Sequence, residues 1–444
     1  MPVEVEEADP RLDHRIGCLL VDLGRMKRIV EVDEKAAYAV IEPGVGFFDL
    51  YRHLADHKIP LLMSIPGNAW GSVIGNALER GIGYTPYGDN SAKLCGLEVV
   101  LPTGELVRTG MGAMANSAIW RHCQFGFGPH WDQLLVQSNF GVVTQAGIWL
   151  MPEPEATLAA TINLAHLEDI GWLVDAMARL RLDGVVQQPL LCGSYLHTAA
   201  LLSQRDSWFK SKGAIPDNVA KAIMAHFGTG WWTAIITLYG YEKAIRAHAD
   251  IVRRALEPRL RDRLRFGGWR RGEPIEGSGA GVPDLLALRI ADWHGGRGGH
   301  VDFSPVLPAD GKLAVAQAQK MKKRFDEFGL DYCASFTVGE RHVGNINSIV
   351  FDRDDADMVK AARSLFETVV ADAAQDGYGV YRAPISFMQL VADRFDFNGH
   401  ALRGPRGSAR SGLSSRSAMT STPSGSLMWC ATVSAACRRR RASM

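Results

Sequence analysis

Short strand-like segments separated by Gly and Pro fill residues 14–152. This pattern of predicted strands and turns constrains the fold more than any other feature of the sequence. The runs are CLLVDL, AAYAVIEPG, LEVVLPTGELV and QSNFGVVTQAGIWL, and one helix is predicted around Phe47 to His57. The tripeptide 102–104, Pro-Thr-Gly, is typical of a hairpin turn. We therefore predict an α+β domain of antiparallel or mixed strands over residues 1–153.

The pattern of predicted secondary structure changes at about residue 154, where longer strands begin to alternate with amphipathic helices. The strand ATLAATINL is followed by a helix, and the strand WWTAIITLYG by another. The last predicted helix, 355–374, carries apolar residues at helical spacing. They are Met358, Ala362, Leu365 and Val369. This grouping predicts a second domain at 154–375, with an antiparallel sheet covered by helices on one side.

Two regions follow this domain. Residues 376–403 form a short segment of their own, and residues 404–444 are rich in Ser, Arg, Ala and Gly with little periodicity. Such a composition is typical of a disordered tail. A shift of the reading frame near Arg403 would produce the same composition. A disordered tail and a frame-shifted tail both remain open as interpretations.

Charge is distributed unevenly along the chain. Eight arginines and no acidic residue or lysine follow Asp396, so subtracting these eight from the net charge of +1 leaves −7 for residues 1–400. Residues 1–400 are therefore mildly acidic, and the only basic segment of the kind that binds nucleic acid lies in the tail.

Composition excludes several classes of protein. With 47% hydrophobic and 22% charged residues the chain is typical of a globular protein. No apolar run is long enough to span a membrane, and no secretory signal is visible. The seven cysteines are scattered without a CxxC pair, so disulfides and structural zinc are not expected. We expect a cytoplasmic protein without a metal site, since His53 and His57, four apart on a helix, lack a third ligand.

The segment ERGIGYTPYGD, residues 79–89, is the first candidate for a functional loop. Its glycines permit close approach of the backbone to a ligand. Asp89 at its end would serve as a proton acceptor if desolvation raised its pKa. Alternatively, Asp89 caps a turn.

Two further candidates lie far along the chain. His300 stands in the glycine-rich stretch HGGRGGHVDFSP. Tyr381 and Arg382 combine a hydroxyl donor with a fork-shaped permanent cation, which suits an anionic ligand. Adjacent side chains on a regular strand point to opposite faces, so the backbone must bend there, which Pro384 makes plausible. A surface ion pair is the alternative.

These segments, together with PGNAWGSVIGN (66–76) and QSNFGVVTQAGIW, resemble the vanillyl-alcohol oxidase and 4-cresol dehydrogenase (p-cresol methylhydroxylase) family of FAD-linked oxidoreductases. The resemblance covers about residues 14–403. It implies an FAD-binding domain over 1–153 and a cap, or substrate, domain over 154–375, with 376–403 returning to the FAD domain. The implied reaction oxidises a para-substituted phenol by hydride transfer from the benzylic carbon to flavin N5, through a quinone methide.

The resemblance also assigns roles to residues. Asp89, Tyr381 and Arg382 would be catalytic, His300 would carry FAD covalently, and Ser304 would lie near the substrate. The residues expected to line the cofactor are Pro66, Gly67, Gly71, Gly75, Asn76, Gly88, Gly141, Val142, Val143 and Thr144.

Partners follow from the same resemblance: a small phenolic substrate, oxygen or a cytochrome as electron acceptor, and a second copy of the chain. Neither nucleic acid nor a membrane is expected. Against the family pattern the chain looks truncated at its N-terminus and altered after about residue 403. The alternatives are a dehydrogenase that passes electrons to a cytochrome and a non-catalytic truncated remnant.

Overall fold

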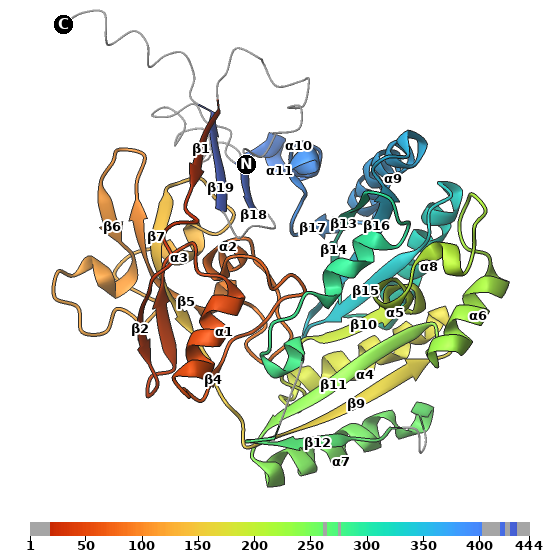
Figure 1. The fold of residues 1–444 in the computed structure, drawn as a ribbon, viewed down its shortest axis with the longest axis horizontal. Helices are drawn as coiled ribbons and strands as arrows, with labels where there is room; N and C mark the ends of the chain where they lie inside the picture. Colours follow the sequence, from red (N-terminus) through yellow and green to blue (C-terminus); the bar gives the residue numbers. More distant parts are fainter. Residues whose placement is uncertain (1–17, 261–263, 274–276, 402–417, 422–426, 433–444) are drawn as a thin grey trace, which may run out of the picture.

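Figure 1 shows a computed structural model of the chain, in which an N-terminal domain (red and orange) lies beside a larger second domain (yellow to blue). The structure describes residues 18–260, 264–273, 277–401, 418–421 and 427–432. No helix among these residues is both long enough and apolar enough to cross a membrane.

The N-terminal domain is built on a five-stranded antiparallel sheet with the order β2-β3-β7-β5-β6. The strands are β2 (Ile29–Asp33), β3 (Tyr38–Ile41), β5 (Leu94–Val100), β6 (Leu106–Arg108) and β7 (Val142–Trp149). A separate pair joins β4 (Leu61–Leu62) and β8 (Met151–Pro152). The helices are α1 (Phe47–Asp56), α2 (Val73–Leu78) and α3 (Trp131–Leu134), with 3₁₀ turns η1 (Ser91–Lys93) and η2 (Gly110–Ala113).

Local sequence explains two of these elements. Helix α1 buries Phe47, Leu50 and Leu54, which recur at helical spacing, and the Asp49 carboxylate accepts a hydrogen bond from Gly46 N at 3.0 Å to cap its start. The predicted turn at 102–104 connects β5 to β6, with Gly104 at φ +90°. Both predictions are confirmed.

The second domain contains a nine-stranded antiparallel sheet. Its order is β12-β9-β11-β10-β15-β16-β14-β17, and β13 also pairs with β16. The strands are β9 (Ala156–Leu164), β10 (Leu190–Ser194), β11 (Trp232–Gly240), β12 (Gly267–Arg270), β13 (Gly298–Phe303), β14 (Pro305–Pro308), β15 (Cys333–Val338), β16 (His342–Asp352) and β17 (Gly379–Val380).

Helices cover both faces of this sheet. Those of the main core are α4 (Ile170–Leu182), α7 (Glu242–Leu260), α8 (Gly311–Glu327) and α9 (Ala356–Gln375). A second cluster joins α5 (Tyr195–Leu202), α6 (Asp217–Phe227) and the 3₁₀ segment η7 (Leu286–Asp292) to Cys333 and Val350. The expectation of helices on one side only is therefore wrong, because β15 and β16 direct apolar side chains to both faces. Shorter 3₁₀ turns are η3 (Leu167–Asp169), η4 (Arg205–Ser207) and η6 (Ser278–Ala280).

Residues 379–391 pack against the second domain, and the predicted return of 376–403 to the N-terminal domain stays a prediction. Strand β17 extends the large sheet beside β14. The ring of Phe387 then stacks on Phe366 of α9, with centroids 4.0 Å apart, because both rings belong to the same core. The remaining elements are η8 (Ile385–Phe387), α10 (Met388–Ala392) and α11 (Phe397–His400).

A three-stranded antiparallel sheet joins the two ends of the described chain. Strand β1 (Cys18–Asp22) pairs with β19 (Leu427–Thr432), which also pairs with β18 (Ala418–Ser421). In these two stretches the structure has strands where the composition predicts a disordered tail. Their sequences, AMTS and LMWCAT, contain aromatic and β-branched residues that favour strands. The rest of 404–444, including the arginine run 438–441, lies outside the described residues.

Candidate functional site

The loop 81–90 is folded tightly upon itself. Gly83 N donates a hydrogen bond to Gly88 O at 2.8 Å. A Cβ atom at Gly83 would lie 2.3 Å from Ser64 Oγ, and one at Gly88 would lie 2.7 Å from Gly83 O and 3.0 Å from Pro189 of the second domain. Neither glycine has a positive φ. Close approach of the backbone, rather than left-handed geometry, is what requires glycine here.

The predicted cofactor loop 66–76 lies against this segment. Asn76 Oδ1 accepts a hydrogen bond from Asn90 Nδ2 at 2.7 Å, and a Cβ atom at Gly81 would lie 2.1 Å from Asn76 Oδ1. Ser72 caps α2 by accepting from Gly75 N at 3.1 Å. The structure therefore brings Gly75 and Asn76 to one side of the 81–90 loop.

Pro66, Gly67 and Gly71 occupy the same loop, and Pro66 and Gly71 are buried. A Cβ atom at Gly67 would lie 3.3 Å from the Tyr84 hydroxyl and 3.3 Å from Ala287 Cβ. Since Ala287 belongs to η7, Gly67 marks a place where the two domains meet.

Asp89 is exposed and caps η1. Its Oδ1 accepts hydrogen bonds from Ser91 Oγ at 2.8 Å and Ala92 N at 3.1 Å. The turn-capping role considered from sequence is thus present. Both bonds use Oδ1, and the exposure of Asp89 does not provide the desolvation on which the proton-acceptor hypothesis depends.

In the segment 141–144, predicted to line the flavin, two residues are buried in the domain and two are only partly buried. Gly141 is buried, and a Cβ atom there would lie 2.5 Å from Val99 Cγ1. Val143 is also buried in the domain core, so its side chain is unsuited to line a cofactor. Thr144 Oγ1 donates to Glu98 Oε1 at 3.1 Å, while Val142 is half-buried.

One backbone edge of this segment remains open. Residues 142 and 143 pair with β5, whereas β3 pairs only with residues 146–149 of β7. Among the described residues, no strand lies beside the other edge at 142–144. Backbone groups, rather than side chains, are what this segment can offer a ligand.

His300 is exposed on β13 and lies near a carboxylate that the sequence reading missed. Its Nε2 is 3.7 Å from Asp302 Oδ2, two residues along the same strand face. Asp302 Oδ1 accepts a hydrogen bond from Ser348 Oγ at 2.7 Å across the strand pair. Ser304, just after β13, is buried.

Tyr381 and Arg382 follow β17. Arg382 is exposed, and its guanidinium carbon is 5.9 Å from the centroid of the half-buried Tyr381 ring. Burial raises the pKa of the Tyr381 hydroxyl, with Arg382 opposing and Asp302 adding to the increase. Burial also raises the pKa of Tyr84 to about 12, and the charges of Tyr381 and Asp302 contribute. Tyr84, Asp302 and Tyr381 therefore form one electrostatic cluster drawn from both domains.

Glu79 is a second acidic residue that the sequence reading did not single out. It follows α2 directly and is half-buried. Burial raises the pKa of its carboxyl to about 7, while the charge of Arg382 acts in the opposite direction. The N-terminal domain thus places an acid that titrates near neutrality within the field of Arg382.

A hydrogen-bonding centre ties the functional loop to the second domain. The hydroxyl of Tyr239 lies 2.5 Å from Gly279 O, 2.9 Å from Gln188 Oε1 and 3.3 Å from Tyr84 O. A hydroxyl has one proton to donate, so these three acceptors compete for it, and Tyr84 O is the most distant of them.

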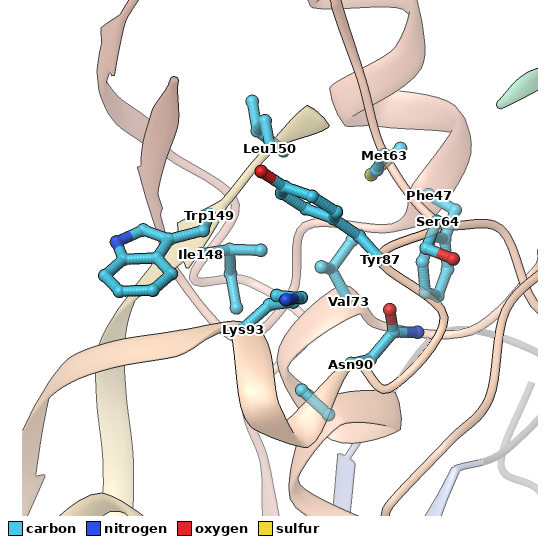
Figure 2. Close-up of a pocket in the computed structure, with 11 residues that line it drawn as sticks. Phe47, Met63, Ser64, Val73, Tyr87, Asn90, Lys93, Ile148, Trp149 and Leu150 are labelled. Atoms are coloured by element: carbon cyan, nitrogen blue, oxygen red, sulfur yellow. The ribbon is translucent and has the colours of Figure 1, made fainter. Parts of the chain in front are cut away.

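Figure 2 shows a narrow, mostly apolar pocket in the N-terminal domain, lined by side chains that include Phe47, Val73, Tyr87, Ile148 and Trp149. Lys93 Nζ lies 4.3 Å from the centroid of the Tyr87 ring. Burial lowers the pKa of Lys93, against the charge of Asp89. None of the residues predicted to be catalytic lines this pocket.

The two histidines considered from sequence lie at the C-terminal end of α1, with His53 inside the helix and His57 directly after it. His53 and His57 have ring centroids 4.3 Å apart, and His57 Nδ1 lies 2.8 Å from His53 O. Within the described residues, no group of three or more His, Cys, Asp or Glu side chains is arranged to hold a metal ion.

Comparison with known proteins decides the family. Residues 11–110 match the model of an FAD binding domain. The chain is 31% identical over 385 residues to the 4-cresol dehydrogenase [hydroxylating] flavoprotein subunit of Pseudomonas putida, covering 85% of this chain and 74% of that one. The chain belongs to the vanillyl-alcohol oxidase and p-cresol methylhydroxylase family of FAD-linked oxidoreductases.

Solved structures agree with this membership. The fold matches a 4-ethylphenol oxidase from Gulosibacter chungangensis in complex with isoeugenol, with a TM-score of 0.81, 32% identity, and coverage of 87% of this chain and 76% of that one. It matches p-cresol methylhydroxylase with substrate bound at the same TM-score, with 29% identity and coverage of 87% and 77%. The predicted α+β class is confirmed, and the protein is an FAD-dependent oxidoreductase.

The residues present fit an FAD of this family. Gly83 and Gly88 allow the backbone of loop 81–90 to pack closely against its neighbours, and β7 offers an open backbone edge. The buried hydroxyl of Ser138, just before that edge, has no hydrogen-bond partner among the residues that the structure describes. An unpaired buried donor beside an open edge suits a polar ligand.

Sequence reasoning missed four residues of the site: Glu79, Tyr84, Gln137 and Asp302. Asp302 was accessible, because it lies two residues from His300 on a predictable strand. Tyr84 stands inside the glycine-rich loop. Nothing local distinguishes Glu79 or Gln137. The charge of Arg382 acts on Glu79, and Gln137 donates a hydrogen bond to Tyr381, 244 positions away.

Proposed function

We propose that the protein oxidises para-substituted phenols, such as 4-alkylphenols or 4-hydroxybenzyl alcohols, at the benzylic carbon. The observation that carries the proposal is the Tyr381–Arg382 pair, in which the charge of Asp302 acts on Tyr381 and the charge of Arg382 acts on Glu79 of the N-terminal domain. The resemblance to a 4-cresol dehydrogenase subunit and a 4-ethylphenol oxidase supports the same substrate class.

Tyr381 and Arg382 would bind the substrate as its phenolate. Lowering a phenol pKa from ~10 to ~7 requires about 4 kcal/mol. A hydrogen bond to a charged group contributes roughly 1.5–3 kcal/mol. A hydroxyl donor and a guanidinium acting together could supply that amount, although Asp302 opposes it by placing a negative charge near Tyr381.

Loss of hydride from the benzylic carbon of a phenolate leaves a neutral para-quinone methide. The FAD, when bound, supplies the hydride acceptor. Addition of water to the quinone methide gives the phenolate of the hydroxylated product and releases one proton. We assign Asp89 to accept that proton on the strength of the family resemblance, and its exposed side chain is accessible from solvent.

His300 would hold the cofactor covalently, and Ser304 would lie near the substrate. His300 is exposed on β13 and therefore accessible to a ligand, whereas Ser304 is buried and could contact only a substrate that enters the second domain. The exposed imidazole and its Asp302 neighbour support the first assignment.

The deciding experiment is anaerobic addition of 4-ethylphenol to the purified protein. Bleaching of the flavin absorbance, lost in both Tyr381→Phe and Arg382→Gln, is the expected result. Flavin that remains oxidised with every 4-alkylphenol would contradict the proposal and favour a non-catalytic remnant. Acid precipitation followed by a denaturing gel tests the covalent link, since flavin fluorescence should stay with the wild-type band and leave the His300→Ala band.

Electron transfer to a cytochrome is the second candidate, favoured by the likeness to a 4-cresol dehydrogenase flavoprotein subunit. Admitting air to the reduced protein separates the two. Prompt recovery of the oxidised flavin spectrum identifies an oxidase, and flavin that stays reduced in air identifies a dehydrogenase. Sedimentation of the same sample tests the expected homo-oligomer.

A further inference from the structure

Gln137 stands at an unusual point of the N-terminal domain. Its backbone is left-handed, with φ +50°, which is uncommon for a residue other than glycine. The backbone N of Gln137 donates a hydrogen bond of 2.8 Å to the carbonyl oxygen of Leu78, the last residue of α2. The end of α2 therefore anchors the backbone from which the Gln137 side chain projects.

That side chain crosses to the segment that follows the large sheet. Gln137 Nε2 donates a hydrogen bond to Tyr381 O at 3.1 Å, between residues 244 positions apart. Both residues are half-buried, so water competes for this bond less than it would on the open surface.

The hydrogen bond matters because its acceptor is the backbone carbonyl of Tyr381. The carbonyl of Tyr381 belongs to the peptide group that joins Tyr381 to Arg382. Since a peptide group is planar, holding its oxygen restrains the backbone rotation on each side, at Tyr381 and at Arg382. Adjacent side chains on a regular strand point to opposite faces. The restraint on the peptide oxygen limits the directions that the side chains of Tyr381 and Arg382 take relative to each other.

We infer that Gln137 is a positioning residue, which holds the peptide between Tyr381 and Arg382 so that both side chains face one anionic ligand. The inference rests on the proposed function for the identity of that ligand, a phenolate. The contact itself is independent of function and is tested separately.

The first test uses no ligand. Protein labelled with 3-fluorotyrosine gives a ¹⁹F resonance for Tyr381, identified by its absence in Tyr381→Phe. Gln137→Met keeps the length of the side chain but removes the donor, and it should shift or broaden this resonance. Gln133→Ala is the matched control, because Gln133 Nε2 makes a comparable bond of 2.9 Å to Ser91 O within the N-terminal domain. It should leave the resonance unchanged.

The second test uses 4-nitrophenol, whose ionised form is coloured. Wild type should bind it as the phenolate, and Gln137→Met should bind the phenolate about 2- to 10-fold more weakly, the range expected for one neutral hydrogen bond. Gln133→Ala should bind as wild type does.

The two readouts separate the possible failures. Wild type that does not bind nitrophenolate, but shows the ¹⁹F change in Gln137→Met, would sink the phenol assignment and retain the contact. An unchanged Tyr381 resonance in a folded Gln137→Met protein, or unweakened phenolate binding by it, overturns the inference. If Gln137→Met does not fold, Gln137→Ala takes its place under the same criteria.

Discussion

Asp302 Oδ1 accepts a hydrogen bond of 2.7 Å from Ser348 Oγ, and the two residues stand directly opposite each other on β13 and β16. This bond fixes a carboxylate whose other oxygen faces His300. The same charge contributes to the raised pKa values of Tyr84 and Tyr381. One strand pair therefore supplies the negative centre around which the titratable groups of the site are arranged.

Asp302→Asn should lower the pKa of both tyrosines, because an ionised tyrosine no longer faces a carboxylate. The pKa of Tyr84, about 12 in the wild type, should move toward the ordinary value of 10, although burial, its main cause, remains. Ultraviolet titration of tyrosinate in Asp302→Asn, with Tyr84→Phe and Tyr381→Phe to assign the signals, measures this. Unchanged titration curves would mean that Asp302 is screened from both hydroxyls.

Glu79→Gln should stabilise the protein at alkaline pH. The folded-state pKa of Glu79, about 7, is raised above the ordinary value of 4.5, so the folded protein holds this proton more tightly than the unfolded chain does. Stability is therefore lost as pH rises from about 4.5 to 7, by at most about 3 kcal/mol. Urea unfolding should show a larger gain for Glu79→Gln at pH 8 than at pH 5. Glu34→Gln, at an exposed position, is the control, and an equal gain at both pH values would refute the assignment.

Asp331→Ala should destabilise the second domain by ~3–5 kcal/mol, because it leaves a buried arginine without its counter-charge. Asp331 accepts from Arg205 Nε at 2.8 Å, and their side chains are 2% and 9% exposed. The exposed pair of Arg363 and Glu367 gives the comparison, since Glu367→Ala should cost less than about 1 kcal/mol. Denaturant unfolding of both variants measures the difference, and equal losses would show that burial of the pair is irrelevant.

Gly88→Ala should distort the 81–90 loop, because its Cβ atom would lie 2.7 Å from Gly83 O and 3.0 Å from Pro189. Overpacking of this kind costs roughly 1–3 kcal/mol. We expect lower stability together with less flavin per polypeptide, measured by absorbance after purification. Gly344→Ala is the control, since no atom lies within 4 Å of its added Cβ. Flavin content equal to wild type in Gly88→Ala would separate this loop from cofactor binding.

Local pattern predicted much of the secondary structure. The helix expected at 355–374 is α9 (Ala356–Gln375), and the helix expected around Phe47 to His57 is α1 (Phe47–Asp56). Apolar spacing and turn residues determine such elements because they act within a few positions. The same locality explains why helices on the second face of the large sheet were missed: a fully buried strand such as β15 gives no alternation to read.

The sequence by itself determined the family, the α+β class and the candidates Asp89, His300, Tyr381 and Arg382, because their short motifs specify local chemistry. Only the tertiary structure decided that Asp302 faces His300, that Val143 points into the core, and that Gln137 holds the carbonyl of Tyr381. The reason is physical. Contacts between residues 244 positions apart depend on how two domains pack, and no local pattern of side chains encodes that placement.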